Sequence, residues 1–169
     1  MWKEIADNYE VERDKLSLPA ILIDKIIVDL AMEDQLGPVL DFGAGSGTLA
    51  RLLASRGRQV TAYEPNAPMR EVLIRQTPAE LSKHIRVVDN LDELPMESHF
   101  ETILCVNVVD HLLDVHSTFR MFRSRVAPAG KLVLCIPHPM KNIGAWVKEG
   151  KKDAWDYVYY RLNDYMNEG

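Results

Sequence analysis

Short apolar runs alternate with longer segments of helical periodicity along most of the chain. Five of the runs have the length and apolar content of buried strands, and they lie at residues 39–42, 59–63, 85–88, 102–106 and 131–136. Apolar residues spaced three and four apart predict helices between them, at residues 48–56, 66–75 and 117–126. Repeated strand–helix–strand units of this length predict an α/β fold with a doubly wound parallel sheet, in three αβα layers.

A further helix precedes the first strand. Ser17 can cap this helix, and Pro19 then falls in its first turn. Gly37-Pro38 ends the helical pattern, and Pro128-Ala129-Gly130 is expected to form the turn before the fifth strand. We expect four residues to form the buried apolar face of this first helix: Ile21, Leu22, Ile26 and Leu30.

The turn after the first strand is the most informative stretch of the chain. Asp41 ends the strand, and glycines follow at alternate positions, Gly43, Gly45 and Gly47. Glycine lets the backbone turn sharply and lets a ligand approach the main chain, and a glycine-rich strand-to-helix turn is where open α/β sheets bind nucleotides. The usual dinucleotide fingerprint is G-x-G-x-x-G. Because the third glycine here comes one residue early, the spacing argues against a nicotinamide-dependent dehydrogenase.

Composition is compatible with one globular domain. With 169 residues, 47% of them hydrophobic, the chain can bury one core. The net charge of −5 argues against a general nucleic-acid surface, and the absence of a long apolar run argues against a membrane span or a signal peptide. Cys105 and Cys135 lie in apolar strand patterns, which is typical of buried free thiols in a reducing cytoplasm. No cysteine–histidine spacing indicates a metal site.

The D-x-G-x-G-x-G turn, with Glu64 closing the second strand, resembles the class I S-adenosylmethionine-dependent methyltransferases. The resemblance covers residues 36–138. It implies a Rossmann-like methyltransferase fold, S-adenosylmethionine as the cofactor and S-adenosylhomocysteine as the product. It also implies direct in-line transfer of a methyl group, and the absence of an Asn-Pro-Pro-Tyr motif after the fourth strand favours an O or N atom of a small molecule as the acceptor.

The resemblance places cofactor contacts at the carboxyl ends of successive strands. The backbone of the glycine turn, including Ala44, is expected to face the methionine part of the cofactor, with Asp41 helping to hold this end; a strand-end cap is the alternative for Asp41. Glu64 is expected to accept hydrogen bonds from the ribose hydroxyls. Pro65 and Met69 follow, and Met69 either stacks on the adenine or fills the core.

Further contacts are expected after the third and fourth strands. Asp89 matches a position that commonly contacts the adenine amino group. The side chain of Asn90 either adds an adenine contact or forms a turn. The backbone of Val106 and Asn107 is expected to line the cofactor pocket near its sulfur.

Three residues are candidates for catalysis. Residues 106–114 resemble the family's N-V-L-E-H-L-x-D stretch, so His111 either orients the acceptor or acts as a general base, or is a hydrogen-bonded histidine at a helix start. Asp114 is expected to cap the next helix. His138 follows the fifth strand between two prolines, and Tyr9 belongs to a stretch that resembles the family's W-x-x-x-A-x-x-Y lead-in.

The end of the chain departs from the family pattern, in which two more strands follow the fifth. Residues 139–169 are rich in aromatic residues, which indicates one amphipathic helix or lid segment and not a strand pair. We therefore expect a single domain over residues 1–169, with a helical lid at 1–35, a cofactor-binding core at 36–138 and this aromatic segment at the end. Three explanations stay open: a truncated chain, a homodimer in which a second copy covers the open sheet edge, or a relative that binds the cofactor without turnover.

Two functions follow from the sequence. The first is methyl transfer to a small-molecule acceptor, with neither nucleic acid nor membrane as a partner. The alternative is a non-catalytic protein or partner subunit that binds S-adenosylmethionine or S-adenosylhomocysteine.

Overall fold

The computed structural model describes residues 18–33, 37–95, 98–136, 144–148 and 157–162. Its contacts divide the chain into two units, residues 1–135 and 136–169, and each is described by itself. The elements of the first unit are α3 (Leu18–Met32), β1 (Val39–Phe42), α4 (Thr48–Ala54), β2 (Val60–Tyr63), α5 (Ala67–Gln76), α6 (Ala79–Ser82), β3 (Ile85–Val88), the 3₁₀ turn η1 (Leu91–Glu93), β4 (Phe100–Val106), the 3₁₀ turn η2 (Val109–His111), α7 (Val115–Arg125) and β5 (Val126–Cys135).

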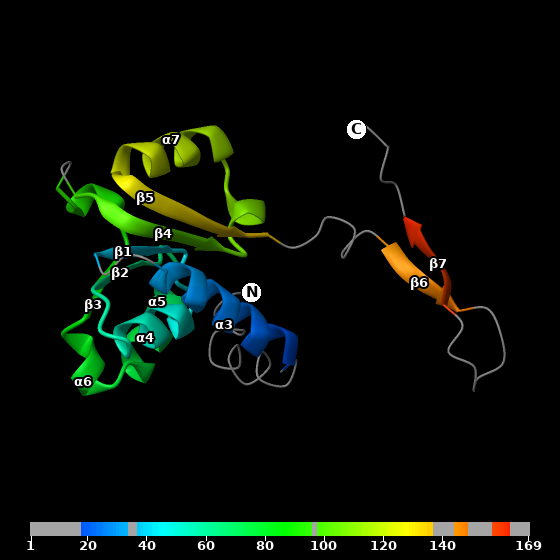
Figure 1. The fold of residues 1–169 in the computed structure, drawn as a ribbon, viewed down its shortest axis with the longest axis horizontal. Helices are drawn as coiled ribbons and strands as arrows, with labels where there is room; N and C mark the ends of the chain where they lie inside the picture. The colour runs from blue at the N-terminus through cyan, green and yellow to red at the C-terminus, as the bar shows by residue number, and fades with distance from the viewer. Residues whose placement is uncertain (1–17, 34–36, 96–97, 137–143, 149–156, 163–169) are drawn as a thin grey trace. The chain divides into compact units, whose positions relative to one another are not determined.

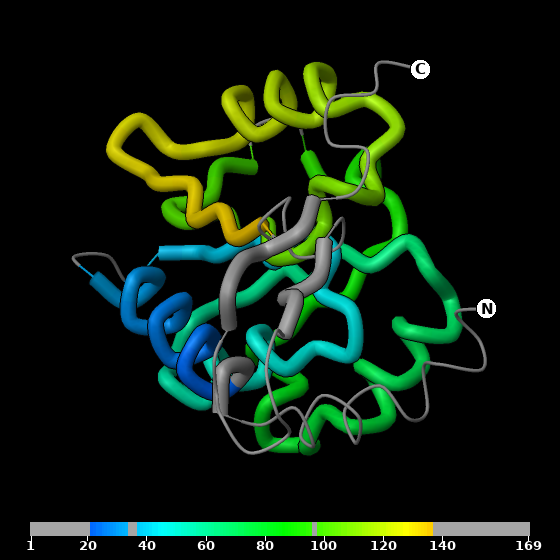
Figure 2. Tube along the Cα trace, turned by 90° about the vertical axis from the view of Figure 1, so that its right-hand side faces the viewer, coloured from blue at the N-terminus to red at the C-terminus, as the bar shows by residue number. Residues whose placement is uncertain are grey.

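Five parallel strands form the sheet of this unit, in the order β3-β2-β1-β4-β5 (Figure 1). Helices α3, α4 and α5 lie on one face of the sheet and α7 lies on the other (Figures 1 and 2). Each face has its own core, because successive side chains of a strand point to opposite faces. In β4, Leu104 belongs to the core under α3 and α4, whereas Ile103 and Cys105 belong to the core under α7. The predicted αβα fold is therefore confirmed.

Helix α3 buries a different face from the expected one. Ile21 and Ile26 are about 60% exposed, and Leu22 and Leu30 are exposed as well. The buried residues are instead Ile27, Val28 and Ala31, which contact the core under α4. The helix is apolar around most of its circumference, so the spacing of its apolar residues does not determine which stripe is buried. Ser17 lies outside the described residues.

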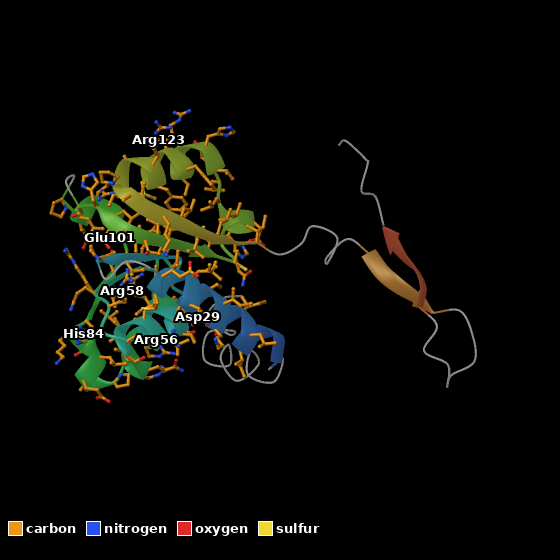
Figure 3. The ribbon with its side chains drawn as sticks, viewed as in Figure 1. Asp29, Arg56, Arg58, His84, Glu101 and Arg123 are labelled. Carbon is orange, nitrogen blue, oxygen red and sulfur yellow. The ribbon has the colours of Figure 1, made fainter. Side chains whose placement is uncertain are left out.

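Two charged side chains join the end of α3 to the sheet. Arg58, which is almost completely buried, donates from Nη1 to the carbonyl of Ala31 and from Nε to the carbonyl of Gly37, both at 2.9 Å. The Oε2 atom of Glu101 accepts from the amide of Gly37 at 2.8 Å. Figure 3 labels both side chains at this junction. Buried ionic groups of this kind need their hydrogen bonds, and here the bonds determine where α3 crosses the sheet.

Strand β5 begins earlier than expected. Val126 pairs with Phe100 and Lys131 pairs with Thr102, so the residues expected to form a separate turn lie inside an irregular stretch of the same ladder. Extra residues of this kind bend a strand locally and interrupt its pairing.

The C-terminal unit contains two strands, β6 (Gly144–Lys148) and β7 (Tyr157–Leu162), in a sheet of their own. They pair antiparallel, with Gly144 opposite Leu162 and Trp146 opposite Tyr160. The expectation of one amphipathic helix or lid segment without a strand pair was therefore wrong here. Tyrosine and valine favour strands, and this preference is a better guide to the segment than its aromatic content alone.

Within the described ranges, no helix is long and apolar enough to cross a membrane.

Two glycines with the same backbone conformation provide a matched test of the fold. Gly47, at the start of α4, and Gly57, after its end, both have φ of 85°. A Cβ on Gly47 would lie 2.5 Å from Cγ of Leu73, whereas a Cβ on Gly57 meets nothing within 4 Å. We expect Gly57→Ala to lower the free energy of unfolding by about 1 kcal/mol, from the left-handed conformation alone. Gly47→Ala should lower it by about 2–4 kcal/mol, because overpacking adds to the strain.

Urea unfolding of the two variants measures this difference. Equal losses would show that Leu73 moves aside at no cost and that the glycine turn is less tightly packed than the structure shows.

Candidate functional site

A cavity of about 580 Å³ opens at the carboxyl ends of β1, β2 and β4. This is the edge at which parallel α/β sheets bind their ligands. The glycine turn lies between two groups of lining residues. On the β2 side these are Tyr63, Glu64, Pro65, Asn66 and Met69, and after β4 they are Val106, Asn107, Val108, Asp110, His111 and Leu112.

The glycine turn owes its shape to left-handed residues. Gly43, Gly45 and Gly47 have φ of 76°, 57° and 85°. The amides of Gly43 and Ala44 both donate to the carbonyl of Tyr63 at 2.9 Å, which ties the turn to the end of β2. Residues with a side chain rarely adopt these φ values, so the alternating glycines are what lets the backbone itself form a wall of the cavity.

The carboxylate of Glu64 joins this turn to the next one. Its Oε2 atom accepts from the amide of Gly45 and its Oε1 atom accepts from the amide of Asn66, both at 2.8 Å. Asn66 in turn caps α5 by accepting from the amide of Met69 at 3.2 Å. Each carboxylate oxygen can accept about two hydrogen bonds. The side chain therefore keeps capacity for two donors from a ligand, such as a pair of hydroxyls.

Asp41 lies at the end of the central strand and is 2% exposed. Its Oδ2 atom is buried and has no hydrogen-bond partner in the described structure. Burial, reinforced by the negative charge of Glu64, raises the pKa of Asp41 from 3.8 to about 7. A buried carboxyl group that lines a cavity, with one oxygen lacking a hydrogen-bond partner, fits a site for a cationic group of a ligand.

The chain turns sharply after β4. Asn107 has a φ of 55°, which is uncommon for a residue with a side chain, and its amide donates to the carbonyl of Cys135 at 2.8 Å. The turn brings η2 over the cavity. There the Nε2 atom of His111 lies 3.9 Å from Oδ2 of Asp110, and both side chains are more than half exposed.

Most of the residues predicted to bind the cofactor lie around this one cavity. They are Asp41, Gly43, Ala44, Gly45, Glu64, Pro65, Met69, Val106 and Asn107, and the predicted catalytic residue His111 also lies there. Met69 is buried and also lines the cavity, so it fills the core as one alternative expected, and its stacking on the adenine stays a prediction.

Three predicted residues do not line the cavity. Gly47 contacts the side chain of Leu73 instead. Asp89 forms an ion pair with Nη2 of Arg70 at 2.8 Å, and Asn90 accepts from the amide of Asp92 at 2.9 Å, the turn-forming alternative. Tyr9 and His138 lie outside the described residues.

Sequence reasoning missed several lining residues. Ser46 and Thr48 lie in or directly after the glycine turn, where only the glycines and Ala44 had been expected to contact the cofactor. Asp24 reaches the cavity from α3, and the signal for it was present: it is a carboxylate in a helix turn that is otherwise aliphatic, Ile21-Leu22-Ile23 before it and Ile26-Ile27 after Lys25. Asp114 caps α7 as predicted, accepting from the amide of Ser117 at 2.9 Å. Within the described part of the chain, no cluster of three or more acidic, histidine or cysteine side chains is placed to hold a metal ion.

The sequence matches the methyltransferase domain family over residues 17–166. It is 30% identical over 98 residues to the ubiquinone biosynthesis O-methyltransferase of Pseudomonas syringae pv. tomato, an alignment that covers 56% of this chain and 41% of the relative. The chain spans between 24% and 53% of the length of the curated relatives compared.

Solved structures share the fold. A putative S-adenosyl-L-methionine-dependent methyltransferase from Methanococcus maripaludis superposes with a TM-score of 0.65 at 22% identity, over 78% of this chain and 62% of that one. The glycopeptide N-methyltransferase MtfA complexed with S-adenosyl-L-homocysteine superposes with a TM-score of 0.58 at 18% identity, over 83% and 59%.

The raised pKa of Asp41 predicts how stability depends on pH. In the folded chain the carboxyl group of Asp41 stays protonated up to a pH of about 7, whereas in the unfolded chain it loses its proton near pH 3.8. The contribution of Asp41 to the free energy of unfolding therefore falls as the pH rises between these values. Between pH 5 and pH 8 the loss amounts to about 2–3 kcal/mol, at about 1.4 kcal/mol for each pH unit. Asp41→Asn, which cannot ionise, should lack this loss.

Denaturant unfolding of both proteins at pH 5 and pH 8 measures the difference, with Asp92→Asn as the exposed control. Relative to the parent chain, the free energy of unfolding of Asp41→Asn should rise between pH 5 and pH 8, and that of Asp92→Asn should change as the parent's does. Parallel changes in all three proteins would refute the raised pKa.

Proposed function

This chain belongs to the methyltransferase domain family, and we propose that it transfers a methyl group from S-adenosylmethionine to an O or N atom of a small molecule. The observation that carries the proposal is the arrangement at the cavity. There the carboxylate of Glu64 accepts hydrogen bonds from the amides of Gly45 and Asn66, while the buried Oδ2 atom of Asp41 has no hydrogen-bond partner in the described structure.

The residues around the cavity suit the parts of this cofactor. Glu64 holds the ribose through its remaining acceptor capacity, because a carboxylate can bind two neighbouring hydroxyls. Met69 and Pro65 lie on the same side of the glycine turn and offer an apolar surface to the adenine. Asp41 and the backbone of the glycine turn hold the methionine end, whose ammonium group satisfies the carboxylate oxygen.

S-Adenosylmethionine, when bound, supplies a methyl group that is already activated by its sulfonium charge. The protein therefore mainly binds, aligns and excludes water. The turn after β4 also lines the cavity. Asn107 has its left-handed conformation in this turn, and His111 lies at the rim. His111 orients the acceptor or takes its proton near neutral pH.

Two further parts of the proposal concern the surroundings of the protein. A second copy of the chain covers the outer edge of β5, and the protein works in the cytoplasm. Strand β5 is the outermost strand of its sheet, and exposed leucines on it, Leu132 and Leu134, support the first part.

Calorimetric titration with S-adenosylmethionine and S-adenosylhomocysteine tests cofactor binding. We expect a dissociation constant in the micromolar range for the parent chain, which corresponds to about −8 kcal/mol. Glu64→Gln should weaken binding by about 10- to 100-fold, because one end of the amide side chain donates and must face an N–H of the glycine turn or of Asn66. The matched control is Glu80→Gln, an exposed residue of α6, which should bind like the parent.

Thermal unfolding of each variant separates lost affinity from lost structure. The absence of binding to both ligands at millimolar concentration would refute the proposed cofactor. Binding with no transfer of a labelled methyl group to any acceptor would identify the alternative function, a protein that binds the cofactor without turnover.

A further inference from the structure

The backbone of Asn107 is strained at a point where it lines the cavity. Its φ is 55°, and every other described residue with a positive φ is a glycine. The residue directly follows β4 and is part of the cavity wall. Residues with a side chain rarely adopt this conformation, and those that do so cluster at functional sites, where the surrounding structure keeps them in place. The strain at Asn107 therefore indicates a role in the site.

The side chain of Asn107 does not account for this conformation. It is exposed, and it forms no hydrogen bond or ion pair with any other described residue. The backbone is fixed instead, because the amide donates to the carbonyl of Cys135 at the end of β5 at 2.8 Å. Asparagine tolerates the left-handed region better than most residues with a side chain. What the surrounding structure uses is therefore the direction that the backbone takes at this residue.

This direction matters because the next residue packs against the glycine turn. Val108 lines the cavity and also packs on the core under α7. A Cβ on Gly43 would clash with Cγ2 of Val108 and would lie 3.2 Å from its Cγ1, so the valine fits here only against a glycine. The carbonyl of Val108 accepts from the amide of His111 at 2.9 Å, which closes η2. The conformation of Asn107 thus determines where Val108 and η2 lie at the cavity.

Resting on the proposed function, we propose that Asn107 is a positioning residue whose left-handed backbone, and not its side chain, holds the turn after β4 against the glycine turn and so completes the cofactor site. The turn is exposed at Asn107, Asp110 and His111, so it can shift without unfolding the sheet. A turn that is already in place lowers the entropy lost when the cofactor binds. If the left-handed conformation becomes unfavourable, the turn leaves its place in a fraction of the molecules, and the apparent affinity falls with that fraction.

A series of substitutions at Asn107 separates the backbone from the side chain. Calorimetry gives the dissociation constant of S-adenosylhomocysteine for the parent chain and for Asn107→Gly, Asn107→Ala and Asn107→Val. Glycine adopts a positive φ readily, the Cβ of alanine opposes it, and a β-branched valine opposes it most. We expect the affinity to fall about five- to tenfold from Asn107→Gly to Asn107→Ala, and further to Asn107→Val. Loss of a contact made by the side chain would instead weaken the glycine and alanine variants equally.

The matched control is Gly57→Ala. Gly57 has a φ of 85°, is not among the lining residues, and a Cβ there meets nothing within 4 Å. This substitution introduces the same kind of strain away from the cavity, so it should lower the temperature of unfolding and leave the affinity for S-adenosylhomocysteine within about twofold.

The outcomes separate this inference from the proposed function. Equal affinities of Asn107→Gly and Asn107→Ala, in a parent chain that binds S-adenosylhomocysteine, would overturn the positioning role alone. A loss of affinity in Gly57→Ala as large as that in Asn107→Ala would also overturn it, because the strain would then act through overall stability. Failure of the parent chain to bind S-adenosylhomocysteine would refute the proposed cofactor and the positioning role together.

A double-mutant cycle tests the contact between the two turns. Gly43→Ala should displace Val108 and weaken the binding of S-adenosylhomocysteine by about tenfold or more. Adding Val108→Ala removes the clashing methyl groups, so the double variant should bind about threefold more tightly than Gly43→Ala alone. In the control pair, Gly45→Ala adds a Cβ that meets only Cε of Met69, at 3.6 Å, and Val108→Ala should bring no recovery. No recovery with Gly43→Ala, or equal recovery in both pairs, would overturn the inference.

Discussion

The carboxylate of Glu64 is the constraint on which the site depends. It follows β2 directly, and its two oxygens hold the amide of Gly45 in one turn and that of Asn66 in the next. Two strand-to-helix connections are thereby locked together by one buried side chain. The glycine turn keeps its left-handed conformation, α5 begins where Asn66 caps it, and Met69 is carried to the wall of the cavity. A carboxylate that already orders both turns reduces the entropy that the protein must lose when a ligand binds.

A second set of buried contacts determines the other wall. Arg58 and Glu101 both form hydrogen bonds with the backbone of Gly37, and Arg58 also donates to the carbonyl of Ala31 in the last turn of α3. These bonds orient α3 so that Val28 and Ala31 contact α4 while Asp24 lines the cavity. The charge at the rim therefore depends on an arginine far from it in sequence. Such a contact sets the rotation of a helix that is apolar on nearly every side, where hydrophobicity alone has no preference.

Local chemistry explains what could be predicted from the sequence. The strands at 39–42 and 85–88 and the Asp114 cap depend on a few adjacent residues, and all were predicted. The buried face of α3 depends on Arg58, and the fate of Asp89 depends on Arg70, a partner in another element. The β6–β7 pair was missed because aromatic content was read without its strand preference. For the cavity, strand-end position identified half of the lining residues, but it had no means of finding Asp24, which approaches from a helix.

The unpartnered oxygen of Asp41 also has a consequence for proton balance. With its pKa raised to about 7, the carboxyl group of Asp41 is close to half protonated in a neutral buffer. A cation that docks beside it favours the ionised form, so binding releases part of a proton to the solution. The heat recorded in any calorimetric titration near neutrality then includes the ionisation enthalpy of the buffer. Measured in phosphate and in Tris, one and the same binding event will give two different apparent enthalpies, and their difference counts the protons that leave the site.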